Sequence, residues 1–300
     1  MKNSALYFLF LVFSVACSPP SSKKDALVFQ SDFGLKDGAV AAMKGVAFGV
    51  SDKLRIFDLT HEIPPYNIWE ASYRLDQTAM YWPVGTVFVS IVDPGVGSDR
   101  KSIVLKTKSG HYIVSPNNGT LTLVAEHLGI EEIREIDETK NRLSNSNESY
   151  TFHGRDVYAY TGARLAAGVI SFEEVGKKLE NTIVKLDYQK PVFENGLVRG
   201  NIPVLDVQYG NVWSNIDKST FSKLNVQYGD SIQVKIYHDQ EMVYDHKVIF
   251  AKTFSDVQKG KTLGYMNSLL NFSIGVNQAS FADQFHVASG EAWSLELRKK

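Results

Sequence analysis

Short apolar runs alternate with amphipathic stretches along the first part of the chain. Such runs are typical of buried strands, and they occur at residues 26–30, 55–59, 87–92 and 112–114. Between and after them, apolar residues recur at helical spacing, which predicts helices over residues 38–50 (with Asp37 as the N-cap), 67–80, 120–127, 156–167 and 172–179. Strands that alternate with helices predict an α/β N-terminal domain, residues 26–187, with a mostly parallel sheet.

The pattern changes beyond residue 191, after a linker at Asp187–Pro191. Short β-type runs separated by turn residues follow at 231–237, 243–251, 263–266 and 273–276. Many short strands with few helices are typical of a closed or sandwiched β fold. We therefore predict a smaller C-terminal β-barrel domain over residues 192–300.

The N-terminus has the pattern of an export signal. Lys2 precedes an apolar run at residues 5–16, which is too short to span a bilayer but suits the core of a signal peptide. Ser14–Cys17 resembles a bacterial lipobox, in which the cysteine carries the lipid. We expect residues 1–25 to be a signal peptide and tether, with Cys17 as the lipidation site of an exported lipoprotein in the cell envelope. The alternative is a plain signal and a soluble secreted or periplasmic protein.

Composition narrows the class of ligand. The 300 residues are 44% hydrophobic, enough for substantial cores, and the net charge is −1 without a long basic run. Nucleic acid is therefore not an expected partner, because neutralising its backbone takes clustered Lys and Arg. The single cysteine excludes an internal disulfide, and the histidines lack metal-type spacing, so we expect no metal site. A small molecule is the expected ligand.

Three polar segments contain the residues suited to chemistry: 93–100, 116–119 and 151–156. The first two follow apolar strands, and the ends of strands in open α/β sheets are where ligands bind. Asp93, Arg100 and His153 within these segments place an acid, a guanidinium and an imidazole at turns. Each alone is also compatible with an ordinary role, as a turn acid, a surface arginine or a packed histidine.

Five segments in one order resemble the S-adenosylmethionine (SAM) hydroxide adenosyltransferase family, relatives of the fluorinase and chlorinase enzymes: 31–34, 93–100, 116–119, 151–156 and 206–211. The resemblance extends from about Phe29 to the C-terminus. It implies an α/β domain followed by a β-barrel, a homotrimer with sites between subunits, SAM as the substrate and no cofactor. It also implies that Asp93, Arg100 and His153 position and activate a water or hydroxide.

The same resemblance implies residues that hold the substrate. Asp32 matches an acid that binds the ribose hydroxyls, and Tyr66 matches an aromatic residue near the ribose and C5′. Asp206 and Asn211 match groups at the methionine end. The full set of substrate-binding residues implied is Asp32, Tyr66, Phe152, Asp206, Tyr209, Asn211, Asn267 and Ser268. Leu269 and Leu270 follow Ser268 where the family commonly has glycine or arginine.

These residues lead to one principal hypothesis and two alternatives. The principal one is hydrolysis of SAM to adenosine and L-methionine, by in-line attack of an activated water or hydroxide on C5′. A halide-dependent adenosyltransferase is the second hypothesis, although such relatives replace the Arg and His pair with a halide pocket. The third is a lipoprotein that binds the nucleoside or SAM without turnover. The sequence leaves open which residue takes the proton.

Overall fold

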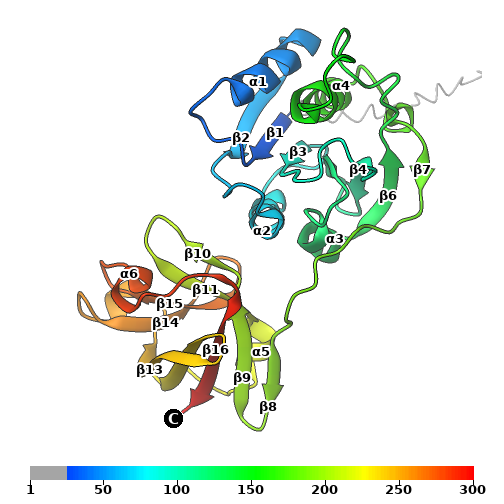
Figure 1. Ribbon diagram of the computed structural model, residues 1–300. Coiled ribbons are helices and arrows are strands. Elements are labelled where there is room, and N and C mark those ends of the chain that lie inside the picture. The colour runs from blue at the N-terminus through cyan, green and yellow to red at the C-terminus, as the bar shows by residue number, and fades with distance from the viewer. Residues whose placement is uncertain (1–25) are drawn as a thin grey trace, which may run out of the picture.

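The computed structural model describes residues 26–300, which form two domains joined by an extended segment (Figure 1). Each domain is built around one sheet. Across residues 26–300, none of the helices combines the length and apolar character needed to cross a membrane. The expected signal peptide, tether and lipidation site at Cys17 lie outside the described residues.

The N-terminal domain contains a seven-stranded mixed sheet. Its strands lie in the order β2 (Arg55–Thr60), β1 (Ala26–Ser31), β3 (Val87–Ile91), β5 (Tyr112–Pro116), β4 (Ser102–Thr107), β6 (Ile130–Glu135) and β7 (Lys178–Leu179). The pairs β1–β2, β1–β3 and β3–β5 are parallel, whereas β4–β5, β4–β6 and β6–β7 are antiparallel. The predicted mostly parallel sheet is thus correct for only half of the pairs.

A short connection explains the antiparallel half. Residues 108–111 join β4 to β5, and the N–H of Gly110 donates to the carbonyl of Thr107 at 2.9 Å. So short a connection allows a hairpin, whereas parallel neighbours need a crossover of a dozen or more residues. The prediction failed here because it did not identify β4 as a strand.

Helices cover both faces of this sheet (Figure 1). Leu27 and Phe29 of β1 share a core with one group of helices, and Val28 shares a core with the other, as side-chain alternation in a strand requires. The first group is α1 (Ala39–Val50), the π-helix η1 (Gly154–Ala159) and α4 (Tyr160–Ala166), and the second is α2 (Ile68–Ala79) and α3 (Thr122–Leu128). The predicted helices at 38–50, 67–80 and 120–127 are confirmed as α1, α2 and α3.

Residues 172–179 do not form the predicted helix. They form one turn of 3-10 helix, η2 (Glu173–Val175), and the edge strand β7. Gly176 lies between them with φ at 150°, and a Cβ at this position would collide with the carbonyl oxygen of Glu135. Close approach to β6 therefore ends the helix. At the start of α1 the N-cap is Gly38 rather than Asp37, although Asp37 Oδ1 accepts the Ala39 N–H at 2.9 Å.

The C-terminal domain is rich in sheet. Its nine strands lie in the order β10 (Val204–Asp206), β11 (Asn211–Asp217), β15 (Asn271–Val276), β14 (Thr262–Met266), β13 (Glu241–Phe250), β12 (Ser231–His238), β16 (Gly290–Lys299), β9 (Leu197–Ile202) and β8 (Val192–Glu194). Three short helices accompany them: α5 (Lys218–Ser222), η3 (Phe254–Asp256) and α6 (Phe281–Phe285). The order has two ends, β10 and β8, so these pairings do not show the closed barrel that was predicted.

Helix α2 ties the two domains together. Trp69 Nε1 donates to the carbonyl of Pro203 at 3.1 Å, and an Arg74 Nη donates to the carbonyl of Leu205 at 3.0 Å. Tyr73 and Val204 pack in one cluster beside these bonds. Helix α2 thereby fixes the start of β10, the strand that ends at Asp206.

Substitution of Gly162 tests the packing of α4 on the sheet. A Cβ on Gly162 would overlap Val89 of β3, whereas a Cβ on Gly45, on the exposed side of α1, meets nothing within 4 Å. We expect Gly162→Ala to destabilise the protein by about 1–3 kcal/mol, because overpacking outweighs the gain in helix propensity. Gly45→Ala is the matched control and is expected to be neutral or stabilising by up to about 1 kcal/mol. Urea midpoints measure both, and equal midpoints for the two variants would contradict this packing.

Candidate active site

Two acidic residues lie at one edge of the N-terminal sheet. Asp32 directly follows β1 and Asp93 follows β3, and these strands are parallel neighbours. The chain leaves β1 toward β2 on one side and reaches β3 on the other, so this is the point where strand order reverses. Open α/β sheets place ligand crevices at such points. A cavity of about 250 Å³ lies here, lined by Asp32, Phe33, Pro65, Tyr66, Ile91, Asp93, Val96, Thr151, Phe152, His153 and Gly154. We call it the N-terminal cavity.

A buried ion pair lies at this cavity. Arg100 donates to both carboxylate oxygens of Asp93, with Nε to Oδ1 at 2.8 Å, and the two side chains are only 10% and 7% exposed. A further guanidinium nitrogen donates to Ser102 Oγ at 3.1 Å. Burial is the largest single effect and lowers the pKa of Arg100, but the hydrogen bonds to Asp93 and the nearby groups Tyr158, Asp93 and Glu138 together outweigh it and raise the pKa of the guanidinium. The two-pronged pairing is geometrically specific and keeps Arg100 charged.

The same arginine fixes the protonation pattern of His153. An Arg100 Nη lies 3.2 Å from His153 Nδ1, and a guanidinium only donates, so Nδ1 accepts. A neutral imidazole then carries its hydrogen on Nε2. Burial is the main cause that lowers the pKa of His153, opposed by Glu138 and assisted by Arg100, so the neutral form is favoured.

His153 Nε2 is a buried donor without a partner among residues 26–300. Buried polar groups are rarely left unpaired in native proteins. His153 lines the N-terminal cavity and directly precedes the π-helix η1, a type of helix that is frequent at functional sites. A ligand oxygen in the cavity that accepts from Nε2–H would supply the missing partner.

Asp32 and Tyr66 meet at the rim of the N-terminal cavity. The N–H of Tyr66 donates to Asp32 Oδ2 at 2.9 Å. Tyr66 has φ at 68°, which is uncommon for a residue other than glycine, and the residue is 73% exposed. Phe152 packs edge-to-face on Phe33, with ring centroids 5.7 Å apart. The cavity thus offers a carboxylate and aromatic rings, the groups that suit a nucleoside.

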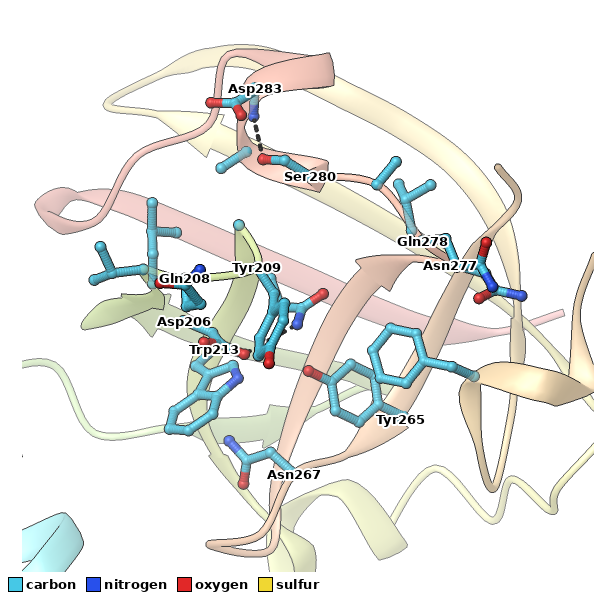
Figure 2. Close-up of a pocket in the computed structure, with 18 of the residues that line it drawn as sticks. Asp206, Gln208, Tyr209, Trp213, Tyr265, Asn267, Asn277, Gln278, Ser280 and Asp283 are labelled. Atoms are coloured by element: carbon cyan, nitrogen blue, oxygen red, sulfur yellow. Dashed lines mark hydrogen bonds between the residues drawn. The ribbon is translucent and has the colours of Figure 1, made fainter. Parts of the chain in front are cut away.

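The remaining predicted residues line a second and larger cavity in the C-terminal domain (Figure 2). This C-terminal cavity has a volume of about 970 Å³ and includes Asp206, Tyr209, Asn211, Asn267 and Ser268. Asn211 Nδ2 donates to Asp206 Oδ2 at 3.1 Å. Asn267 Oδ1 accepts two backbone N–H groups of its own turn, so only its Nδ2 is free for a ligand, and this atom is buried without a partner in the described chain.

Two aromatic residues that line the C-terminal cavity, Trp213 and Tyr265, were not among the predicted site residues. Figure 2 shows Trp213 and Tyr265 beside Tyr209 in the C-terminal cavity. Trp213 Nε1 is a further buried donor that makes no hydrogen bond of normal geometry in the described part of the chain. One signal was available: Trp213 lies two residues after Asn211 on β11, and residues two apart on a strand face the same side.

The structure therefore brings the predicted residues together in two groups rather than one. Asp32, Tyr66, Asp93, Phe152 and His153 line the N-terminal cavity, with Arg100 bound beside them. The other five line the C-terminal cavity, and no residue lines both. Within residues 26–300, no group of three His, Cys, Asp or Glu side chains is arranged to hold a metal ion.

Comparisons with known proteins point to one family. Residues 27–176 match the family described as the SAM hydroxide adenosyltransferase N-terminal domain, and residues 200–294 match its C-terminal domain. The chain is 37% identical over 248 residues to a protein of Methanocaldococcus jannaschii named (R)-S-adenosyl-L-methionine hydrolase, covering 81% of this chain and 85% of that protein. It is 28% identical to a fluorinase of an Actinoplanes species, covering 90% and 97% of the two chains.

A solved structure shows the same fold. The crystal structure of an uncharacterized conserved protein from Thermotoga maritima superposes with a TM-score of 0.84 at 37% identity, covering 91% of this chain and all of that one. The matches to both domains, in the order found here, include the segments that carry the Asp93, Arg100 and His153 cluster and the C-terminal cavity. The chain belongs to the SAM hydroxide adenosyltransferase family.

Proposed function

We propose that this protein hydrolyses S-adenosyl-L-methionine to adenosine and L-methionine. The observation that carries the proposal is the buried cluster of Asp93, Arg100 and His153 at the switch point of the sheet, with Nε2–H of His153 lacking a partner. The relatives named hydrolases support the same reaction, and their names specify the (R) form of the substrate. Both sulfonium epimers are therefore the substrates to compare.

The reaction needs an oxygen nucleophile rather than an acid for the leaving group. The oxygen attacks C5′, the bond from C5′ to sulfur breaks, and the electron pair of that bond goes to sulfur, giving the neutral thioether of methionine. A donor such as Nε2–H stabilises an oxygen that is rich in lone pairs, and the charge of Arg100 acts in the same direction. Both favour hydroxide over water, so the proton leaves to solvent before the attack. Both Asp93 carboxylate oxygens accept hydrogen bonds from Arg100 and keep it in place.

Each cavity binds a different part of the substrate in this proposal. In this proposal Asp32 accepts hydrogen bonds from the ribose hydroxyls, because Tyr66 N–H occupies only Oδ2. Tyr66 and Phe152 flank the ribose and C5′. Asp206, Tyr209, Asn211, Asn267 and Ser268 of the C-terminal cavity hold the rest of the substrate, with the free Asn267 Nδ2 and Trp213 Nε1 as donors.

We further propose a homotrimer in which each site lies between subunits. The separation of the predicted residues into two cavities of one chain supports it, because a complete site then needs the N-terminal cavity of one subunit and the C-terminal cavity of the next. The exposed rings of Tyr66 and Tyr209, at 73% and 67%, are suited to burial at such an interface.

Export and lipid attachment at Cys17 stay a proposal that rests on the N-terminal sequence pattern alone. Fractionation of cells that make the intact chain and the Cys17→Ala variant tests it. Recovery of both proteins in the soluble cytoplasmic fraction would exclude an exported lipoprotein.

Product analysis tests the reaction. We expect purified protein to release adenosine from SAM at a rate indifferent to chloride or fluoride. Arg100→Ala and His153→Ala should each reduce kcat/KM by about a hundredfold or more, since they remove the groups that stabilise the nucleophile. His127→Ala is the control, because His127 is an exposed residue paired with Asp76 away from the N-terminal cavity.

Chromatography separates the three hypotheses. Formation of 5′-halo-5′-deoxyadenosine would establish the halide reaction instead. Binding of SAM without any product from the wild-type protein would establish the non-catalytic binding protein. Either result would overturn the hydrolase.

The acid side of the pH profile should report His153. Because the pKa of His153 is lowered by burial from its ordinary value of 6.5, the ring is neutral at neutral pH and is protonated only as the pH falls below that value. Protonation puts a hydrogen on Nδ1, which then faces the Arg100 guanidinium instead of accepting from it. We expect kcat/KM to fall as the pH drops through this lowered pKa. His153→Gln, which does not titrate, should lose that step, and an identical acid limb in this variant would contradict the assignment.

Mixing two inactive variants tests the shared site. His153→Ala damages the N-terminal cavity and Asp206→Ala the C-terminal cavity. If each site lies between neighbours of a trimer, random exchange of subunits should restore about one quarter of wild-type activity. Denaturing and refolding the variants together, then separately as the control, measures the recovery. Activity that stays at the level of the separate variants would show that each chain forms its site alone.

A further inference from the structure

A chain of hydrogen bonds, exposed at one end and buried at the other, lies beside the N-terminal cavity and has no part in the mechanism above. Lys44 Nζ donates to Asp58 Oδ2 at 2.6 Å, and Asp58 Oδ1 lies 3.1 Å from His61 Nε2. His61 Nδ1 lies 2.7 Å from Ser31 Oγ, which in turn accepts the N–H of Phe33 at 3.3 Å. The chain runs from α1 through the end of β2 to the turn that contains Asp32.

The donor and acceptor groups of these side chains determine which atom donates in each hydrogen bond. A carboxylate only accepts, so His61 carries its hydrogen on Nε2 and its Nδ1 accepts from the Ser31 hydroxyl. Burial lowers the pKa of His61 against the opposing effect of Asp58, which favours this neutral form. Ser31 and His61 are 0% and 3% exposed, so each lost bond would leave a buried polar atom unpaired.

Ser31, His61 and Asp58 have the connectivity of a hydrolase triad, but burial excludes that role. Ser31 lines neither the N-terminal nor the C-terminal cavity, so its hydroxyl cannot reach a substrate. Its oxygen already accepts a backbone N–H. A nucleophilic serine needs an exposed hydroxyl next to its base. The three residues therefore serve another purpose.

The bonds hold two loops of the cavity together. Besides the bond from Ser31 to His61, the N–H of Gly34 donates to the carbonyl of His61 at 2.8 Å. The second loop continues to Tyr66, whose N–H donates to Asp32 Oδ2 at 2.9 Å. The contact between Asp32 and Tyr66 is therefore supported on both sides. Ser31 holds the turn that contains Asp32, and His61 holds the loop that leads to Tyr66. Both Asp32 and Tyr66 line the N-terminal cavity.

We propose that Ser31 and His61 are positioning residues that hold the Asp32 carboxylate in place for the ribose hydroxyls. The proposal rests on the proposed function, in which Asp32 binds the ribose. The proposal predicts that a substitution in this pair weakens the binding of one part of the ligand rather than of the whole ligand. Removing the Ser31 hydroxyl should weaken recognition of the ribose hydroxyls and leave the affinity for the rest of the nucleoside unchanged.

Binding of two nucleosides to the full chain tests this. Calorimetry gives Kd for adenosine and for 2′,3′-dideoxyadenosine, which lacks both ribose hydroxyls. We expect the wild type to prefer adenosine by about tenfold or more, as for hydrogen bonds to a charged group. In Ser31→Ala and in Asp32→Ala the preference should fall to about threefold or less, while Kd for the dideoxy compound stays the same. Ser31→Thr keeps the hydroxyl and should restore the preference.

Two further variants make the outcome decisive. Asp58→Ala breaks the chain at a side chain that is 39% exposed, so it keeps the test available if a buried substitution prevents folding. His127→Ala removes the other histidine–aspartate pair of this domain and should keep the wild-type preference. Unchanged preference in Ser31→Ala and Asp58→Ala, or equal weakening of both nucleosides, would overturn the proposal. Neither result affects adenosine release by the wild type, so failure of the proposed function is recognised separately.

Discussion

The buried pair of Arg100 and Asp93 is the interaction on which the arrangement of the active site depends. Removing one member of such a pair typically destabilises a protein by about 3–5 kcal/mol, because the other charge stays buried without a partner. Here the pair has a second consequence. By presenting a donor to His153 Nδ1, the arginine determines which imidazole nitrogen carries the hydrogen. The ion pair between Asp93 and Arg100 therefore determines that His153 presents an N–H donor, at Nε2, to a ligand.

The fold brings these three residues together from separate segments. Asp93 and Arg100 flank the turn between β3 and β4, and His153 precedes the π-helix that packs on the same sheet face as α1. Next to the site, the sheet changes from parallel to antiparallel pairing. Its parallel strands create the crevice at the β1–β3 switch point, and its antiparallel strands bring Arg100, at the start of β4, back beside Asp93. A fully parallel sheet would not return the chain there so quickly.

The rim of the N-terminal cavity is held by a different type of interaction. A directed hydrogen-bond chain through Ser31 and His61 fixes the loops that carry Asp32 and Tyr66, and the positive φ of Tyr66 is kept by the bond to Asp32. Strained backbone of this kind persists only where its surroundings determine it. The cluster of Asp93, Arg100 and His153 and the hydrogen-bond chain through Ser31 and His61 together leave little freedom on either side of the cavity. Preorganisation of this kind lowers the cost of binding and of reaching the transition state.

The sequence by itself determined the helices α1, α2 and α3, the two-domain organisation and the family, because these depend on local periodicity and on motifs read in order. It also named Asp32, Tyr66, Asp93, Phe152 and His153, which line the N-terminal cavity, and Arg100, which binds beside them. It did not reveal β4, the end of the helix expected at 172–179, or the lining residue Trp213. Those features depend on which segments lie side by side: a hairpin partner for β4, and the close approach of Gly176 to β6. The tertiary structure alone decided the tautomer of His153, the burial of Ser31 and His61, and the separation of the predicted residues into two cavities, because hydrogen-bond direction and burial arise only when distant segments pack together.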